Sequence, residues 1–183
     1  VMEKALPSRM GANLLDQLPD GLHVGLCGAG GPMPSPVASG PCVVVAAGQR
    51  LFMIDSGTNG VRNLARMGFQ PGTLEAVFLT HFHSDHLDGL GETGTIRWAG
   101  GDNTKPLPVY GPKGIKKVVR GFNLAYSQDF TYRHDHHGDT VAPLSGAGLK
   151  AMQFNKPPIG ELTAVISDGQ LKVEALAVDH APV

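Results

Sequence analysis

Short apolar runs bounded by glycine and proline recur along the chain and predict a series of strands. The runs with this pattern span residues 22–27, 41–47, 50–54, 76–79, 107–110 and 171–178. Apolar residues spaced three and four apart predict amphipathic helices over 58–67 and 114–127. A polar loop that contains histidines, and then a connector rich in proline and glycine, are expected between residue 127 and the last strand.

The alternation of strands with helices favours an α/β domain in which helices cover a sheet. A length of 183 residues suits a single domain, and the sequence contains no internal repeat. The weak periodicity of residues 1–20 predicts a surface lead-in, so the domain is assigned to residues 21–183. The 25 glycines and 14 prolines indicate many short elements joined by tight turns.

The charge balance is close to neutral, with 15 lysines and arginines against 16 aspartates and glutamates. Nucleic acid is therefore not expected as a partner, because domains that bind it usually carry a basic excess. The one basic cluster, Lys113, Lys116, Lys117 and Arg120, is interpreted as a solvated helix face. No apolar run approaches the roughly 18 to 20 residues of a membrane span, so we expect a soluble protein, either cytoplasmic or exported with a removed leader.

The two cysteines, Cys27 and Cys42, are too few for a disulfide scaffold and stand outside any Cys-x-x-Cys spacing. Buried, reduced thiols are the favoured interpretation, since free cysteine behaves as a small hydrophobic residue. A disulfide between them is the alternative.

The strongest chemical signal is the motif HFHSDH at residues 81–86, which follows an apolar strand. Histidines two apart on an extended segment point to the same side, so His81 and His83 can hold one ion. Asp85 and His86, past the bend, face a second position. These donors suit zinc, and also manganese or iron. The alternative is a run of solvated histidines, but ligand sites in α/β sheets favour the carboxyl ends of strands.

Residues 79–92, with the sequence LTHFHSDHLDGLGE, resemble the signature loop of the metallo-β-lactamase superfamily of dinuclear metal hydrolases. Within it, the chain resembles the ribonuclease Z-like and arylsulfatase-like branch. Supporting motifs are GAG at 28–30, IDSG at 54–57, VYGP at 109–112 and VDHAP at 178–182. The resemblance covers about residues 21–183 and implies a four-layer αββα sandwich, of which this chain supplies the amino-terminal half or somewhat more. The remainder of the polypeptide, or a second fragment, would complete the fold.

By that resemblance, His81, His83 and His180 would hold one metal ion. Asp85 and His86 would contribute to a second ion and to catalysis. Asp55 would hydrogen-bond to the histidine loop and orient the metal ligands without binding the metal itself.

The chain also departs from the family pattern. In the family, a bridging aspartate and a last histidine follow the third ligand histidine, so both would lie beyond Val183. A rearranged order of metal ligands would take His137 as the third ligand histidine, Asp139 as the bridging aspartate and His180 as the last histidine. These residues would then lie closer together in the sequence than the corresponding ligands of the family do.

The implied activity is that of a metal-dependent hydrolase, in which two zinc ions activate a shared water as a hydroxide that attacks an ester-type bond. Phosphodiester, sulfate ester, carboxylic ester and lactone all fit, and a small-molecule ester is the expected substrate. His134, His136 and His137 are candidate substrate-binding residues, with solvated loop residues as the alternative. The rival interpretations are an iron-dependent oxygenase or redox protein on the same scaffold, and a non-catalytic metal-binding module. The relatives also suggest a homodimer.

Overall fold

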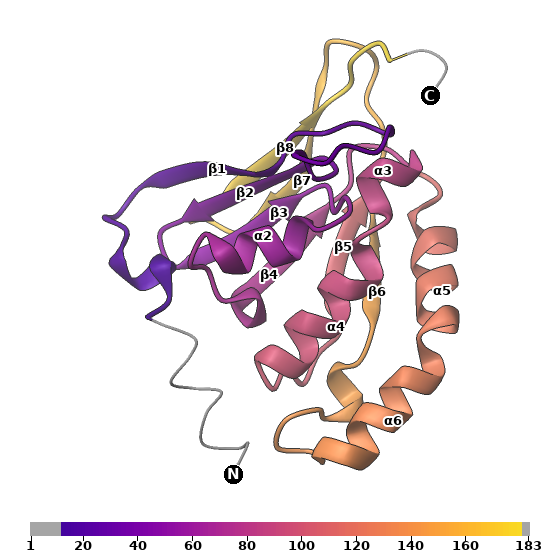
Figure 1. The fold of residues 1–183 in the computed structure, drawn as a ribbon. Helices are drawn as coiled ribbons and strands as arrows, with labels where there is room; N and C mark the ends of the chain where they lie inside the picture. The colour runs from indigo at the N-terminus through magenta and orange to yellow at the C-terminus, as the bar shows by residue number, and fades with distance from the viewer. Residues whose placement is uncertain (1–11, 181–183) are drawn as a thin grey trace.

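The structure is a computed structural model that describes residues 12–180, and a six-stranded mixed sheet forms its centre (Figure 1). The strand order is β1-β2-β3-β4-β5-β6. Their bounds are β1 (Leu22–Gly28), β2 (Cys42–Ala47), β3 (Arg50–Ile54), β4 (Leu74–Phe78), β5 (Leu107–Gly111) and β6 (Leu149–Gln153). Strands β1 to β3 pair antiparallel, and β3 to β6 pair parallel. A separate antiparallel hairpin contains β7 (Leu162–Ser167) and β8 (Lys172–Leu176).

The helices are short, and most of them connect the parallel strands. The α-helices are α2 (Gly60–Arg66), α3 (Ser84–Leu87), α4 (Leu90–Gly100), α5 (Ile115–Ala125) and α6 (Ser127–His137). Three 3-10 turns are η1 (Leu14–Gln17), η2 (Pro71–Thr73) and η3 (Leu144–Gly146). Over residues 12–180, none of these helices combines the length and the apolar character that crossing a membrane requires.

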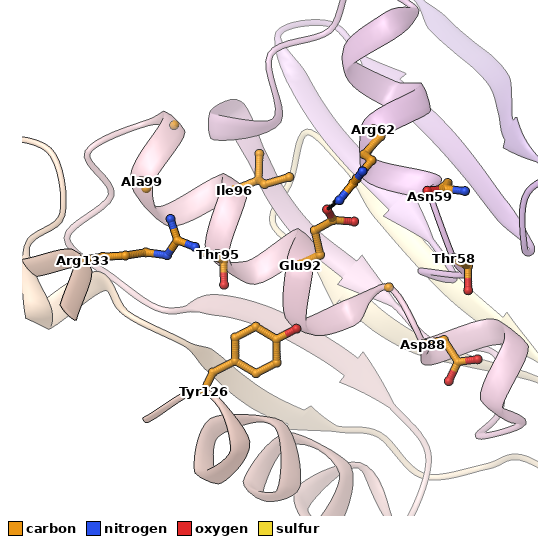
Figure 2. Close-up of a pocket in the computed structure, with 12 residues that line it drawn as sticks. Thr58, Asn59, Arg62, Asp88, Glu92, Thr95, Ile96, Ala99, Tyr126 and Arg133 are labelled. Atoms are coloured by element: carbon orange, nitrogen blue, oxygen red, sulfur yellow. Dashed lines mark hydrogen bonds and ion pairs between the residues drawn. The ribbon is translucent and has the colours of Figure 1, made fainter. Parts of the chain in front are cut away.

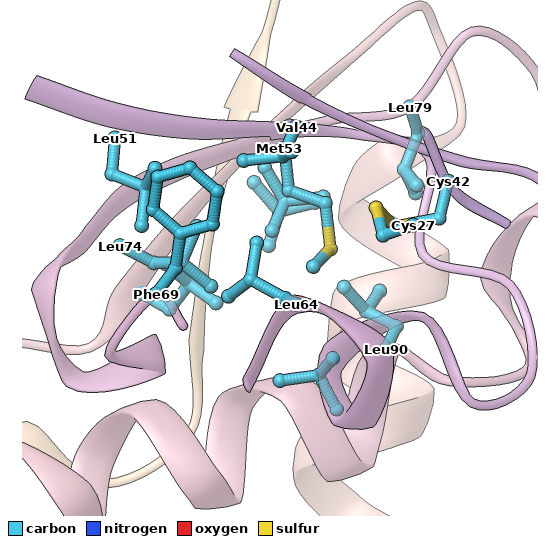
Figure 3. Packing of buried hydrophobic residues seen from close by; sticks show 14 of the residues in the cluster. Cys27, Cys42, Val44, Leu51, Met53, Leu64, Phe69, Leu74, Leu79 and Leu90 are labelled. Atoms are coloured by element: carbon cyan, nitrogen blue, oxygen red, sulfur yellow. A yellow bond between two sulfur atoms is a disulfide. The ribbon is translucent and has the colours of Figure 1, made fainter. Parts of the chain in front are cut away.

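The main hydrophobic core lies between one face of the sheet and helices α2, α4 and α5. Inward residues of the strands, such as Val44 and Met53, meet Leu64 of α2 and Leu90 of α4 in Figure 3, and all four are at most 1% exposed. Alternate residues along β2 are buried, as expected of a strand whose two faces meet different layers. Burial of these large side chains holds the helices against the sheet.

A second, smaller core lies on the opposite face of the sheet, against the β7–β8 hairpin. Phe52 and Phe78 are buried there, and Val165 and Val173 of the hairpin pack against them. The layers are thus helices, the six-stranded sheet and the two-stranded sheet, which confirms the predicted α/β fold. Of the four layers of the expected sandwich, the part of the chain that the structure describes forms three.

Residues 128–137 are not the loop that the sequence predicts, because α6 covers Ser127–His137. The helix carries no regular apolar stripe, and contacts with other parts of the chain hold it in place. The ring of Phe130 lies edge-on to Trp98, with centroids 5.7 Å apart. Contacts with distant residues, which periodicity does not reveal, therefore fix this helix.

The lead-in also differs from the prediction of a surface segment, at least from residue 13 onward. Leu15 is only 3% exposed and belongs to the main core. The Asn13 side chain accepts hydrogen bonds from the backbone N–H groups of Leu15 and Gln70. Residues 1–11 lie outside the described part of the chain.

The preference for reduced cysteines is wrong, because Cys27 and Cys42 form a disulfide. Their strands β1 and β2 are antiparallel neighbours, and a bulge near Gly28 places the two Cα atoms 5.0 Å apart. That separation is within the range that a disulfide spans. Sequence spacing alone could not reveal the pairing, since it depends on the register of two strands.

Candidate metal centre

The histidine motif lies at the carboxyl ends of two neighbouring parallel strands. Phe78 at the end of β4 pairs with Tyr110 of β5, and the Leu79 backbone N–H donates to the Tyr110 carbonyl at 2.8 Å. The chain then runs through His83 into the single turn α3. The expected bend between the two halves of the motif is therefore present.

Three imidazoles converge at this edge of the sheet. One ring nitrogen from each of His81, His83 and His180 lies within 4.8 Å of the others. The His81 Nε2 and His83 Nδ1 atoms are 2.8 Å apart. The ring centroid of His180 is 4.9 Å from that of His81 and 5.6 Å from that of His83. The structure thus brings together two distant segments that the sequence singles out, in an arrangement suited to a shared cation.

Asp55 ties the histidine loop to the end of β3. It lies directly after the strand, is 6% exposed and has a φ of 57°, a conformation that aspartate tolerates better than most residues. Its carboxylate accepts hydrogen bonds from the Thr80 backbone N–H at 2.9 Å and from the Thr80 hydroxyl. It also lies 2.8 Å from His86 Nδ1.

The contact between Asp55 and His86 fixes the tautomer of the imidazole. A carboxylate oxygen can only accept, so Nδ1 of His86 carries the proton. Nε2 is then left with its lone pair, the form in which histidine binds metals. The same Nε2 lies 3.7 Å from a carboxylate oxygen of Asp85, and the His86 ring is 4.1 Å from that of His81. His86 is therefore an immediate neighbour of His81, and Asp85 is a neighbour of His86.

Thr80 is a site residue that the sequence analysis missed. Its hydroxyl bonds to Asp55 and also lies 3.0 Å from His81 Nδ1, so it joins the carboxylate to the first histidine of the motif. Its position directly before His81 was the only available signal.

Burial lowers the pKa of His81, and the neighbouring His86 and His83 lower it further. Both effects act in the same direction, because burial and positive charge on a neighbouring ring each disfavour the protonated form of His81. The neutral imidazole that results is the metal-binding form.

Close backbone packing fixes the position of the loop. The Ser56 N–H donates to the His86 carbonyl, and the Gly89 N–H donates to the Ser56 carbonyl, both at 2.8 Å. A Cβ atom on Gly57 would come within 2.5 Å of the Asp85 carbonyl oxygen. Glycine is required there because the two loops touch through their backbones.

The histidines proposed for substrate binding do not join this cluster. His134, His136 and His137 belong to α6, which lies at the opposite end of the molecule from α3 (Figure 1). His134 Nδ1 donates to the Ala142 carbonyl at 3.0 Å. The rearranged order with His137 and Asp139 as metal ligands finds no support, because His137 ends α6, Asp139 follows it, and neither belongs to the group of converging ligand atoms.

A cavity of about 690 Å³ lies on the helix side of the molecule, between α2, α4 and α6 (Figure 2). Tyr126 and Arg133 line one side, and the Arg62–Glu92 ion pair, with Nε and Oε1 2.6 Å apart, spans another. None of the converging histidines lines it. This cavity is therefore separate from the histidine cluster.

Curated proteins resemble this chain in sequence. The chain is 37% identical over 164 residues to ribonuclease Z of Mycobacterium bovis (strain BCG / Pasteur 1173P2), covering 88% of this chain and 55% of that protein. It is 36% identical over 124 residues to ribonuclease Z of Mycolicibacterium gilvum, covering 67% and 43%. The chain thus spans about half the length of these curated relatives. The matches support the ribonuclease Z-like part of the resemblance, and the arylsulfatase-like part stays a prediction.

Among solved structures, human tRNase Z, short form, superposes with a TM-score of 0.61 at 21% identity, covering 84% of this chain and 59% of that one. The metallo-beta-lactamase fold protein YhfI from Bacillus subtilis gives a TM-score of 0.54 at 20% identity, with 85% and 57% covered. At these identities the likeness supports the fold.

The names of the relatives contradict the prediction that nucleic acid is not a partner, because ribonuclease Z is by name an enzyme that acts on RNA. The prediction used a net charge summed over 183 residues. Such a sum averages acidic and basic surfaces, so it cannot reveal a local basic patch.

The family itself is established over the part of the chain that carries the histidine loop. The sequence pattern of the Metallo-beta-lactamase superfamily matches residues 36–153, which is more than half of the chain. This range includes β2 to β6, the disulfide-bonded Cys42, Asp55 and the motif at residues 81–86. The chain therefore belongs to the metallo-beta-lactamase superfamily.

Proposed function

We propose that the protein is a metal-dependent hydrolase that cleaves phosphodiester bonds in RNA. The observation that carries the proposal is the convergence of His81, His83 and His180 at the carboxyl edge of the sheet. The ribonuclease Z relatives supply the choice of a phosphodiester over the other ester-type bonds.

The proposed ligands of the first ion are His81, His83 and His180. Asp85 and His86 contribute to a second ion and to catalysis. Zinc suits this mixture of neutral imidazoles and a carboxylate, and manganese or iron also binds such donors. When bound, zinc polarises the phosphoryl oxygen and makes water a stronger nucleophile near neutral pH.

The residues of this chain prepare the site by fixing orientation. Asp55 holds the proton on His86 Nδ1 and so directs Nε2 toward the cluster. The hydrogen bonds from Thr80 to Asp55 keep that carboxylate in place. We further propose that residues outside this chain complete the second ion's ligands, since the curated relatives are nearly twice as long.

The experiment uses the complete protein, including the residues proposed to complete the second ion's ligands, and compares RNA cleavage by wild type, a His83→Ala variant and a His136→Ala control. Treatment with a chelator should abolish cleavage, and added zinc should restore it. Loss of a metal ligand should lower the rate by about 100-fold or more, whereas the control on α6 should cleave like wild type. Equal rates for wild type and His83→Ala would refute the metal mechanism.

A further inference from the structure

Helix α5 carries an exposed row of cations, which we call the α5 stripe. It consists of Lys116, Lys117 and Arg120 within the helix and of Lys113, two residues before it, all of them exposed. Spacings of three and four residues place the side chains of Lys116, Lys117 and Arg120 on one face of the helix. The opposite face is buried through Ile115 and Val119, so α5 has a core side and a basic side.

The charges of the α5 stripe are unpaired among residues 12–180. No acidic residue occurs in α5, and none of the four cations forms an ion pair with a described carboxylate. Some arginines elsewhere, such as Arg50 and Arg62, do contact carboxylates. The stripe is therefore a local positive surface on a chain whose net charge is −1.

Helix stability does not explain this placement. Lys116 and Lys117 lie in the first turn of α5, where the positive end of the helix dipole repels cations. A face that needed only solvation would favour acidic residues there, and the first turn contains none. Local preferences are most often violated where a surface serves a function.

The α5 stripe begins beside the metal centre. Gly114 directly precedes α5 and packs against the histidine loop. A Cβ atom on Gly114 would come within 2.9 Å of the Phe82 ring. In Figure 1, α5 starts near α3 and runs away from it toward α6. At about 1.5 Å of rise per residue, the stripe extends roughly 10 Å from that point.

We propose that the α5 stripe binds the phosphate backbone of an RNA substrate and leads the strand to the metal centre. This inference rests on the proposed function. Unpaired lysines and arginines in a row match the regular charges of a nucleic-acid backbone, which supply affinity and register without sequence information. Binding to them should therefore depend strongly on salt and only weakly on sequence.

The experiment measures binding of the full chain to a fluorescein-labelled, single-stranded RNA of 20 nucleotides by fluorescence anisotropy, with gels to verify that the RNA stays intact. The stripe variant is Lys116→Gln/Lys117→Gln/Arg120→Gln. Its affinity near 150 mM salt should fall about tenfold or more. The slope of log affinity against log salt should fall by about 2, because each lost phosphate contact removes roughly 0.7 for a single strand.

The matched control is Arg66→Gln/Lys105→Gln/Lys150→Gln, which removes the same charge. These three residues are also exposed. Arg66 is the last residue of α2, Lys105 precedes β5 and Lys150 lies near the start of β6, so all three are away from the carboxyl edge of the sheet. The control should bind RNA within about twofold of wild type. If wild type and the stripe variant bind with the same affinity and slope, or if the control loses as much affinity as the stripe variant, the inference is wrong.

Two further measurements keep the outcomes separate. If the triple variant fails to fold by circular dichroism, Lys117→Gln alone should lower the salt slope by about 0.7, and an unchanged slope refutes the stripe. Hydrolysis of bis(p-nitrophenyl) phosphate tests the proposed chemistry with a substrate too small to need the stripe, and it is measured on the zinc-loaded complete protein, which includes the residues proposed to complete the second ion's ligands. Absence of that hydrolysis and of RNA cleavage by the complete protein, with the stripe result intact, would overturn the proposed function and leave RNA binding established.

Discussion

At the scale of single residues, Asp55 has the most consequential contacts in the candidate site. It adopts a left-handed backbone conformation and is almost fully buried, two features that cost free energy unless contacts compensate. Its contacts to Thr80 and His86 provide that compensation. The family resemblance indicated a supporting role for Asp55, but the partners of its two oxygens became evident only from the fold.

An Asp55→Asn substitution should weaken zinc binding by about 10- to 100-fold, because the amide cannot hold the proton on His86 Nδ1 as a carboxylate does. Competition with a chromogenic chelator would measure the affinity. Asp139→Asn is the matched control, since that side chain is 85% exposed at the far end of the molecule. Equal affinities for wild type and Asp55→Asn would show that the carboxylate does not orient the metal site.

At the scale of elements, the strands were more predictable than the helices. Alternation and short apolar runs mark β1 to β5 because each strand has a buried face. Helix α4 went unpredicted, since its sequence LGETGTIRWAG contains glycines and threonines that disfavour helix. It is stable because Trp98 is fully buried and Arg97 donates to the carbonyls of Leu74 and Lys105, contacts that link distant segments.

The disulfide between Cys27 and Cys42 should stabilise the pairing of β1 with β2. It closes a loop of 15 residues, and a cross-link of that size contributes about 3 kcal/mol to the free energy of unfolding. A Cys27→Ala/Cys42→Ala variant should lose about that amount in urea denaturation. Wild type with a reductant should behave like the variant, and thiol labelling of the unfolded, unreduced protein should detect no free thiol. Labelling of both cysteines before reduction would show that they are free thiols and not a disulfide.

At the scale of the whole molecule, one face of the sheet is incompletely covered. Leu22, Val24 and Leu26 point to the same side of β1 and are 69%, 65% and 69% exposed. Val24 pairs with Val45, which packs in the small core against the hairpin, so the uncovered residues continue that core toward the sheet edge. The sequence predicted a second sheet on this side from the family resemblance, and the described residues supply two strands of it.

Uncovered apolar rows of this kind usually bind another surface. We propose that the remainder of the fold covers this face, or that a second copy does so where the remainder is absent. The 183-residue chain by itself should therefore associate with increasing concentration in light scattering. A Leu22→Thr/Val24→Thr/Leu26→Thr variant should reduce this association, since threonine keeps the preference for strand and removes most of the apolar surface.

Met33→Thr/Val37→Thr is the control for that experiment. These residues are 78% and 93% exposed, but they lie in the loop between β1 and β2 rather than in a row on a strand. If the exposed face of β1 drives association, the control should associate like wild type. A wild-type chain that stays monomeric at every concentration, or a control that loses association as fully as the β1 variant, would mean that this face does not bind a covering surface.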